Sequence, residues 1–537
     1  MRGGPPRPRP RIFSHPIVSV LLLALPLFAW GISWGLPSRV GWAGDEIMPR
    51  AVEQAARRGF AGGWHTKYPP VHYMVLAALH APVRALAGED TSPADLNHRL
   101  ILASRWLSIL MALGAVWAVY RAAREVTDRR GAALAAVAVA LAPPFVYFAK
   151  TANPEMPMLF WLALSLWLYL RALRRHRLRD WLLLAVTAAL AVGSKDQAYG
   201  FYVLAPLALL PSLARHRRAE GKPGGLHTLL DRRVLLAVAA GLVAFALAFN
   251  LPANWHGFQR HLHTLTGAGA AAEEAQEYPA TAAGHLANLT QNLRHLDFCL
   301  GRHLFALALA GAVAALARPR DPRNQRLLAL LLLGFSYYVT FLAPILFSRD
   351  RYTLPVALVL APCAGHLATR TLSSSRGSAR YLLAAALSIA FAASALRAVS
   401  VNRRMTHDSR YQAEAWLAAH PGQAIAIGRP KHVPRIPRVD WRKALRPNAQ
   451  ALNSADYVVV NVTDLRTPQE RRLYDQLLNG THGYRLARRF RWTSPRDMLS
   501  TRGVLTTLDL INPHLAVFSR VEKTVPGPVG GAAPGEL

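Results

Sequence analysis

The chain has 537 residues, of which 52% are hydrophobic and only 17% are charged, whereas soluble globular proteins usually carry about 25% charged residues. The formal net charge of +33 would suggest a nucleic-acid partner in a soluble protein. Here the arginines lie in short clusters between long apolar segments, as in the cytoplasmic loops of membrane proteins, so no nucleic-acid partner is expected.

The apolar segments predict a polytopic all-α membrane protein. A bilayer core of ~30 Å requires roughly 20 apolar residues per helix. A basic N-terminus (residues 1–15) precedes a transmembrane domain over residues 16–400, whose first helix has no convincing cleavage site and is read as uncleaved. About eleven spans are expected. They lie near residues 16–36, 100–120, 131–149, 154–172, 180–194, 197–214, 233–251, 301–317, 327–347, 353–370 and 380–398.

Orientation follows from the basic connections, because loops rich in Lys and Arg stay in the cytoplasm. The alternate connections then face outward and include two large loops, residues 37–99 and 252–300. This alternation requires that residues 69–87, which begin with Pro69-Pro70, lie in the outer interface and do not cross the membrane. The basic set comprises the N-terminus and residues 121–130, 171–180, 214–233, 318–326 and 370–380.

After residue 400 the pattern changes to short apolar runs that alternate with polar, helix-like stretches. Residues 424–427, 457–460 and 515–518 are such runs, and residues 409–420 are helix-like. The pattern predicts a small α/β domain over residues 401–524. An odd span count places this domain outside the cytoplasm. The Gly/Pro/Ala-rich tail, residues 525–537, is predicted to be disordered.

The first outer loop offers several polar groups. Asp45 and Glu46 follow the first span, where a carboxylate can act as general base towards a hydroxyl; the alternative is a pair of solvated loop acids. Lys67, in the segment Lys67-Tyr68-Pro69-Pro70, can bind a phosphate or simply contact lipid headgroups. His65 and Tyr68 are beside it, in a segment that also fits an interfacial aromatic belt.

Two further outer connections carry ionisable groups. Asn153 and Glu155 precede a helix that opens near Pro154, and ionisable residues at such a depth indicate function. Lys195 and Asp196 interrupt a long apolar stretch, either as a cavity wall or as an isolated ion pair.

Arg349, Arg351 and Tyr352 connect two spans on the outer side. Two arginines there depart from the positive-inside trend. Because planar guanidinium groups suit phosphate, we favour a phosphate site over a surface pair.

No metal site is expected. His256, His261, His263, His285 and His295 match no closed zinc spacing. The two cysteines, Cys299 and Cys363, support neither a disulfide framework nor a metal site.

Taken in order, these segments resemble the C-type (GT-C) fold of lipid-linked glycosyltransferases, in particular the protein mannosyltransferase and aminoarabinose transferase-like group. The resemblance covers roughly residues 16–400. It rests on Asp45-Glu46, the segments KYPP (67–70), NPEMP (153–157), SKDQAYG (194–200) and DRYTLP (350–355), and DSRYQAEAWL (408–417) at the entry to the C-terminal domain.

The resemblance implies an inverting hexosyl or pentosyl transferase that uses a polyprenyl-phosphate sugar and no metal cofactor, on the outer face of a bacterial inner membrane. Asp45 would be the base and Glu46 would shape the site. Lys67 and Arg351, with Arg349 and Lys195, would stabilise the leaving lipid phosphate. The acceptor, whether lipid, glycan or protein, is not implied. A transporter or lipid flippase without glycosyl transfer is the alternative, although no internal repeat favours it.

Overall fold

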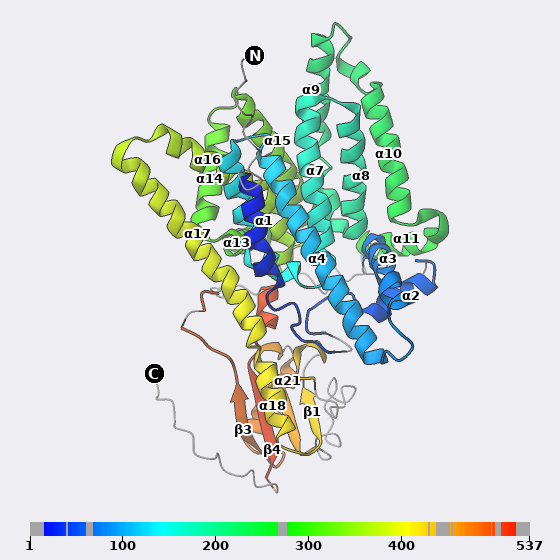
Figure 1. Ribbon diagram of the computed structural model, residues 1–537, viewed down its shortest axis with the longest axis vertical. Coiled ribbons are helices and arrows are strands. Elements are labelled where there is room, and N and C mark those ends of the chain that lie inside the picture. Colours follow the sequence, from blue (N-terminus) through cyan, green and yellow to red (C-terminus); the bar gives the residue numbers. More distant parts are fainter. Residues whose placement is uncertain are drawn as a thin grey trace, which may run out of the picture. The chain divides into compact units, whose positions relative to one another are not determined.

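The computed structural model describes residues 15–38, 41–60, 68–266, 277–427, 430–435, 452, 455–465, 467–495, 497–499 and 506–521 (Figure 1). The Gly/Pro/Ala-rich tail predicted to be disordered, residues 525–537, lies outside the described residues. His65 and Lys67 also lie outside them. The chain separates into two compact units. Unit 1 comprises residues 1–33, 45–402 and 498–507; unit 2 comprises residues 34–44, 403–497 and 508–537.

Unit 1 is helical. The long helices α4, α7, α8 and α10 pack side by side, and α16 packs against α5 and α14 (Figure 1). Its helices are α1 (Pro16–Ala29), α2 (Pro49–Arg57), α3 (Val71–Ala85), α4 (Pro93–Ala123), α5 (Arg129–Ala140), α6 (Pro143–Ala149), α7 (Glu155–Arg175), α8 (Leu178–Ser194), η3 (Asp196–Phe201), α9 (Pro206–Ala219), η4 (Gly225–Thr228), α10 (Arg232–Ala248), α11 (Leu251–Thr266), α13 (Ala282–Leu300), α14 (Arg302–Leu316), α15 (Pro322–Tyr337), η5 (Tyr338–Leu342), α16 (Asp350–Ser374) and most of α17 (Gly377–Thr406).

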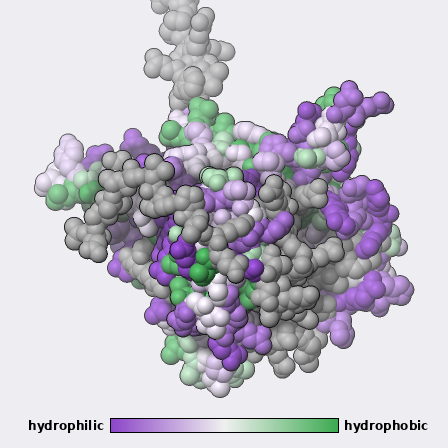
Figure 2. Space-filling view, turned by 90° about the horizontal axis from the view of Figure 1, so that it is seen from below, coloured by the Kyte–Doolittle hydropathy of each residue, from purple (hydrophilic) through white to green (hydrophobic). Residues whose placement is uncertain are grey.

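The predicted multi-pass membrane protein is confirmed, but the count of eleven spans is not. Within the described residues, five helices are long and apolar enough to cross a membrane, or up to eight if each bent pair forms one span. The outward surfaces of the helices suit lipid, because Leu242 of α10 and Leu382 of α17 are 65% and 70% exposed. By contrast, much of the face seen in Figure 2 is hydrophilic, with scattered hydrophobic residues.

Three pairs of helices are bent, and only the first bend falls in the middle of a predicted span, residues 131–149. The helix axis turns by 71° between α5 and α6, where Pro143 and Pro144 remove backbone donors. It turns by 80° between α10 and α11 and by 113° between α13 and α14. Gly301 at the last bend has φ of +80°, and a Cβ there would lie 2.8 Å from Arg397 Nη1. Glycine is therefore required at this bend.

The two predicted outer loops contain helices. The first loop holds α2, α3 and the start of α4, and α3, at 15 residues, is not among the helices that satisfy the length and apolarity needed for a span. In the second loop, α11 and α13 occupy most of the described residues. Residues 69–87 were read as a helix at the outer interface, and α3 lies within this segment.

Unit 2 contains the predicted α/β fold. Its elements are α18 (Ser409–Ala418), β1 (Ala424–Ile427), η6 (Pro430–His432), β2 (Tyr457–Asn461), η7 (Val462–Asp464), α21 (Pro468–Leu478), β3 (Tyr484–Phe490), η8 (Thr507–Leu510, which begins in unit 1) and β4 (Leu515–Arg520). The sheet order is β1-β2-β4-β3, with β1 parallel to β2 and the other pairs antiparallel. Ala413 and Leu417 of α18 pack on one face, and Leu473 and Leu477 of α21 pack on the other.

Residues 34–44, from the end of the first predicted span and the start of the first predicted outer loop, also belong to unit 2. The indole Nε1 of Trp34 donates to Asp408 Oδ2 at 3.0 Å, and the Gly35 amide donates to the Tyr411 hydroxyl at 2.9 Å. The Arg410 guanidinium lies 4.1 Å from the ring centre of fully buried Trp42. Unit 2 is therefore built from two distant parts of the chain.

We expect Trp34→Phe to loosen unit 2 while leaving unit 1 unchanged. The substitution keeps an aromatic ring but removes a hydrogen bond to a buried carboxylate, which costs about 1.5–3 kcal/mol. Hydrogen exchange of the full-length protein should accelerate in α18 and not in α7. Unchanged exchange in α18 would show that residues 34–44 do not stabilise this unit.

Candidate functional site

Asp45 and Arg351, which are 306 residues apart in sequence, form an ion pair. Arg351 Nη1 donates to Asp45 Oδ2 at 2.7 Å, and the two side chains are 25% and 22% exposed. Arg351 lies in the first turn of α16. Asp45 has φ of +59°, a conformation that Asp and Asn adopt more readily than most residues. The turn thus presents a partly solvent-accessible carboxylate to the first turn of α16.

Glu155 and Lys195 form a second ion pair beside the first. Lys195 Nζ donates to Glu155 Oε1 at 2.7 Å, and the same oxygen is 3.9 Å from Arg351 Nη1. Glu155 begins α7 and Lys195 follows the last residue of α8, so two helix ends position them. Glu155 Oε2 is buried and accepts no hydrogen bond from the described residues. This oxygen therefore keeps an unused capacity to accept a hydrogen bond.

Aromatic groups surround these four charged side chains. Tyr352 accepts a hydrogen bond from Arg351 Nη2 at 3.1 Å, and Lys195 Nζ lies 5.3 Å from the centre of its ring. Tyr68 is hydrogen-bonded to Asp45. Burial, followed by the charges of Glu155 and Asp45, raises the pKa of the Tyr68 hydroxyl well above its usual range. Tyr68 thus remains a protonated hydrogen-bond donor at physiological pH. We call Asp45, Tyr68, Glu155, Lys195, Arg351 and Tyr352 the acidic-basic cluster.

Glu46 does not belong to this cluster. Arg105 binds both of its oxygens, at 2.8 and 2.9 Å, and Oε1 also accepts from the Ala152 amide at 3.1 Å. Both side chains of the pair are fully buried. Because Arg105 and the Ala152 amide occupy its two oxygens, Glu46 contacts the connection before α7 and not the cluster. That it shapes the site remains a prediction. By holding Ala152, Glu46 fixes the connection that leads to Glu155.

Arg349 was predicted to bind phosphate, but it forms the surface pair that was the alternative. Its two terminal nitrogens donate to Glu277 at 2.9 and 2.6 Å, with both side chains partly exposed. Its guanidinium also lies over the Phe347 ring. Two positions separate the arginines along the chain, yet Arg351 joins the cluster and Arg349 turns away.

The remaining predicted site residues either have contacts outside the cluster or lie outside the described residues. Asp196 pairs with His261 Nε2 at 2.8 Å, so the isolated Lys195–Asp196 pair is not formed. Asn153 is buried in the connection before α7. His65 and Lys67 lie outside the described residues, although Tyr68, which follows Lys67 directly, reaches Asp45.

A C-terminal segment supports the start of α16. Asp350, which is fully buried, accepts from the Thr507 amide at 2.9 Å and from its hydroxyl at 2.7 Å. Asp350 immediately precedes Arg351, so this contact restrains the helix turn that carries the arginine. Thr507 was not predicted as a site residue, because nothing in the local sequence relates it to a helix that begins 157 residues earlier.

Arg105 was also missed, but a signal for it exists. It is a charged residue inside the predicted span 100–120, and a charge at that depth requires a partner. No comparable signal marks His261 as the partner of Asp196.

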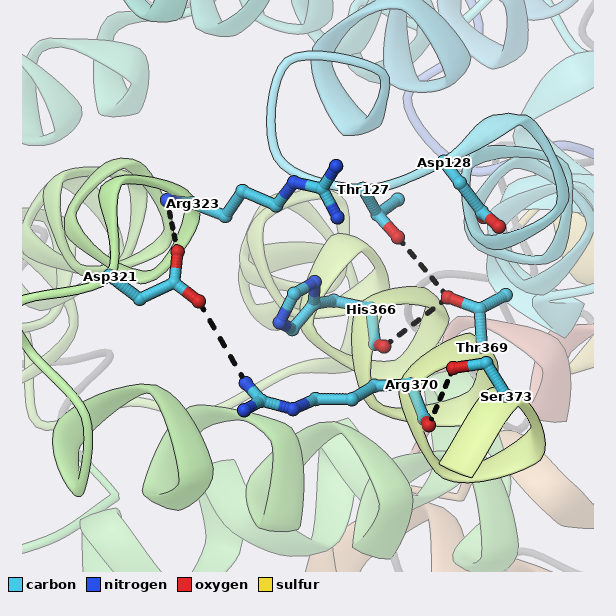
Figure 3. A pocket seen from close by; sticks show the side chains of 8 residues that line it. All are labelled: Thr127, Asp128, Asp321, Arg323, His366, Thr369, Arg370 and Ser373. Carbon is cyan, nitrogen blue, oxygen red and sulfur yellow. Dashed lines mark hydrogen bonds and ion pairs between the residues drawn. The ribbon is translucent and has the colours of Figure 1, made fainter. Parts of the chain in front are cut away.

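No three His, Cys, Asp or Glu side chains form a group that could hold a metal ion within the described part of the chain. A pocket of about 160 Å³ between the start of α5, the start of α15 and the end of α16 contains none of the predicted site residues. In it, Arg370 Nη1 lies 4.0 Å from Asp321 Oδ2, and two aspartates balance two arginines (Figure 3). The acidic-basic cluster remains the candidate site.

Residues 94–249 match the family model described as dolichyl-phosphate-mannose-protein mannosyltransferase. This match confirms the resemblance to GT-C glycosyltransferases that the sequence motifs predicted. The matched segment contains Glu155 and Lys195 of the cluster. A search of curated proteins found no significant match.

Solved structures provide distant similarities. The apo oligosaccharyltransferase of Archaeoglobus fulgidus is 16% identical, with a TM-score of 0.47; the match covers 76% of this chain and 59% of the archaeal one. The apo ArnT of Cupriavidus metallidurans is 12% identical, with a TM-score of 0.45, covering 95% and 98% of the two chains. The ArnT bound to undecaprenyl phosphate is 15% identical, with a TM-score of 0.42, covering 73% and 70%. The chain thus spans about three-fifths of the length of the archaeal enzyme.

Proposed function

We propose that this protein is an inverting glycosyltransferase that moves a sugar from a polyprenyl-phosphate donor to an acceptor hydroxyl. We place the reaction on the outer face of a bacterial inner membrane. The observation that carries the proposal is the contact of Asp45 with Arg351, next to Glu155 and Lys195. Together with the family match over residues 94–249, it supports sugar transfer from a lipid-linked donor.

The chemistry assigns a different task to each charge. Asp45 takes the proton of the acceptor hydroxyl, whose oxygen then attacks the anomeric carbon from the face opposite the phosphate. The bond from that carbon to the phosphate oxygen breaks, and the polyprenyl phosphate leaves. Arg351 and Lys195 stabilise the charge that develops on the leaving phosphate. Glu155, with one oxygen free of hydrogen bonds to the described residues, is placed to accept from a sugar hydroxyl.

The two ion pairs suggest how a bound donor would prepare the base. Arg351 binds Asp45, and Lys195 binds Glu155. The two positive charges and the two negative charges of these side chains therefore cancel. A donor phosphate would compete with Asp45 for the guanidinium, since Arg binds phosphate well. Withdrawal of Arg351 towards the phosphate would leave a carboxylate oxygen of Asp45 available for the proton. Lys67 remains proposed as an additional phosphate ligand.

The two nearby arginines provide a matched test. We expect Arg351→Gln to reduce sugar transfer by about 10²–10³-fold, the usual cost of removing one donor that stabilises developing charge. Arg349→Gln, which removes the same charge from an exposed ion pair, should reduce transfer by less than about fivefold. Both variants would be assayed as purified protein with polyprenyl-phosphate sugars, after confirmation that they are folded.

Equal losses in the two variants would contradict the assignment of Arg351 to the donor phosphate. If the folded wild-type protein transferred no sugar from any common donor but moved lipid across the bilayer, the transporter or flippase alternative would replace this proposal.

A further inference from the structure

The arginine-rich end of unit 1 is separated from the acidic-basic cluster by the length of a helix. The helix α7 begins at Glu155 in the cluster and ends at Arg175, 21 residues later. At 1.5 Å per residue these two ends are about 30 Å apart, close to the thickness of a bilayer core. A ligand bound near Arg175 is therefore distinct from the proposed donor.

Two neighbouring pockets open at this end. The first, of about 300 Å³, lies between the ends of α4 and α7 and the start of α5, and five arginines line it: Arg121, Arg124, Arg129, Arg174 and Arg175. The second, of about 220 Å³, lies between α7, α9 and α15 and is lined by Arg174, Arg215 and Arg326. Since Arg174 lines both, the pockets are adjacent.

Positive charge dominates both pockets. Among the described residues, seven arginines line them, against the single carboxylate of Glu125, which pairs with Arg174 at 2.8 Å. Arg129, Arg175 and Arg215 are exposed, and their guanidinium groups form no ion pair or hydrogen bond with the described residues. The pocket in Figure 3, at the same end of the bundle, instead balances its arginines with aspartates. An anion is therefore favoured in the first two pockets and not in the third.

The second pocket also has an apolar side. Leu173, Leu207 and Pro211 line it together with the arginines. Leu207 is 64% exposed, so this side continues onto the outer surface of α9. An anion that carries a hydrocarbon chain matches both parts better than a free anion, because the chain can cover this apolar surface while the arginines hold the charge.

We infer that these adjoining pockets, the arginine pockets, bind the headgroup of an anionic phospholipid, with its acyl chains along α9. Loop arginines orient a membrane protein without any cavity. Orientation in the membrane therefore does not explain why two arginine-lined cavities lie next to an exposed apolar helix surface. The inference does not depend on the glycosyl-transfer reaction.

The test compares two double variants that each remove two exposed positive charges from the same end. Arg175→Gln/Arg215→Gln removes one unpaired arginine from each pocket; Arg318→Gln/Arg320→Gln, the control, removes exposed arginines that line neither. Full-length protein in detergent micelles would be titrated with phosphatidylglycerol, phosphatidylethanolamine and glycerol 3-phosphate, and bound lipid measured by native mass spectrometry.

We expect wild-type protein to prefer phosphatidylglycerol over both other ligands. Each arginine near an anionic lipid contributes roughly a factor of five, so Arg175→Gln/Arg215→Gln should weaken phosphatidylglycerol binding about 30-fold, and the control less than about twofold. Equal affinity in all three proteins would overturn the inference. So would equally tight binding of glycerol 3-phosphate, because the site would then recognise phosphate alone and not a lipid.

Discussion

Asp45→Asn should reduce sugar transfer by about 10²–10⁴-fold, the range that a general base contributes. The substitution keeps the size and shape of the side chain. Asparagine adopts the left-handed backbone of this position as readily as aspartate. Its amide oxygen can still accept the hydrogen bond from Arg351. What disappears is the negative charge, and with it the ability to take a proton, so the loss should fall on the chemical step. Donor binding should not weaken, because asparagine competes less than aspartate for the Arg351 guanidinium.

Glu53→Gln is the matched control for this prediction. Glu53 is another carboxylate of the first loop, on α2, where it forms an exposed pair with Arg57. Because such surface pairs contribute little, Glu53→Gln should transfer sugar at nearly the wild-type rate. Full activity of Asp45→Asn would remove Asp45 as the base and direct attention to Glu155.

Arg105→Met is expected to cause the largest loss of stability. It removes the partner of Glu46 and leaves a carboxylate that is fully buried within the protein. Breaking a buried ion pair on one side costs about 3–5 kcal/mol, because the remaining charge has no compensation. The midpoint of thermal unfolding in detergent should fall, as should the yield of monodisperse protein.

The double variant Glu46→Gln/Arg105→Met separates charge from packing. Since it leaves no buried charge, it should recover much of the stability that Arg105→Met loses. Arg57→Gln, which breaks an exposed pair, should change the unfolding midpoint little. If Arg105→Met unfolded at the same temperature as Arg57→Gln, the Glu46–Arg105 pair would not be the support for Ala152 that we describe.

The fold was predictable where periodicity and composition are strong. The apolar runs identified the helices of unit 1, and the apolar segments 424–427, 457–460 and 515–518 coincide with β1, β2 and β4. The strand β3 was not predicted, because its sequence YRLARRF exposes arginines at an edge strand and lacks a simple alternation of apolar and polar residues. The bend between α5 and α6, inside the predicted span 131–149, was missed because a window average of hydropathy does not register a change of direction.

The site was predictable at the level of residue types and not of partners. Asp45, Glu155, Lys195 and Arg351 were selected as charges in the connections between apolar segments, and the structure brings all four together. The position of Arg349 along the chain does not predict that its side chain pairs with Glu277. Nor could it show that Glu46 would be enclosed by an arginine from α4, because such pairings depend on packing between helices far apart in sequence.

The most direct test of the central claim is donor turnover by the purified wild-type protein in proteoliposomes. A panel of polyprenyl-phosphate sugars would be supplied together with a cell-envelope extract as acceptor. We predict release of free polyprenyl phosphate from one donor class, with the sugar attached to the product in the inverted anomeric configuration. A folded protein that consumes no donor, or a product that retains the donor's configuration, would contradict direct displacement at Asp45.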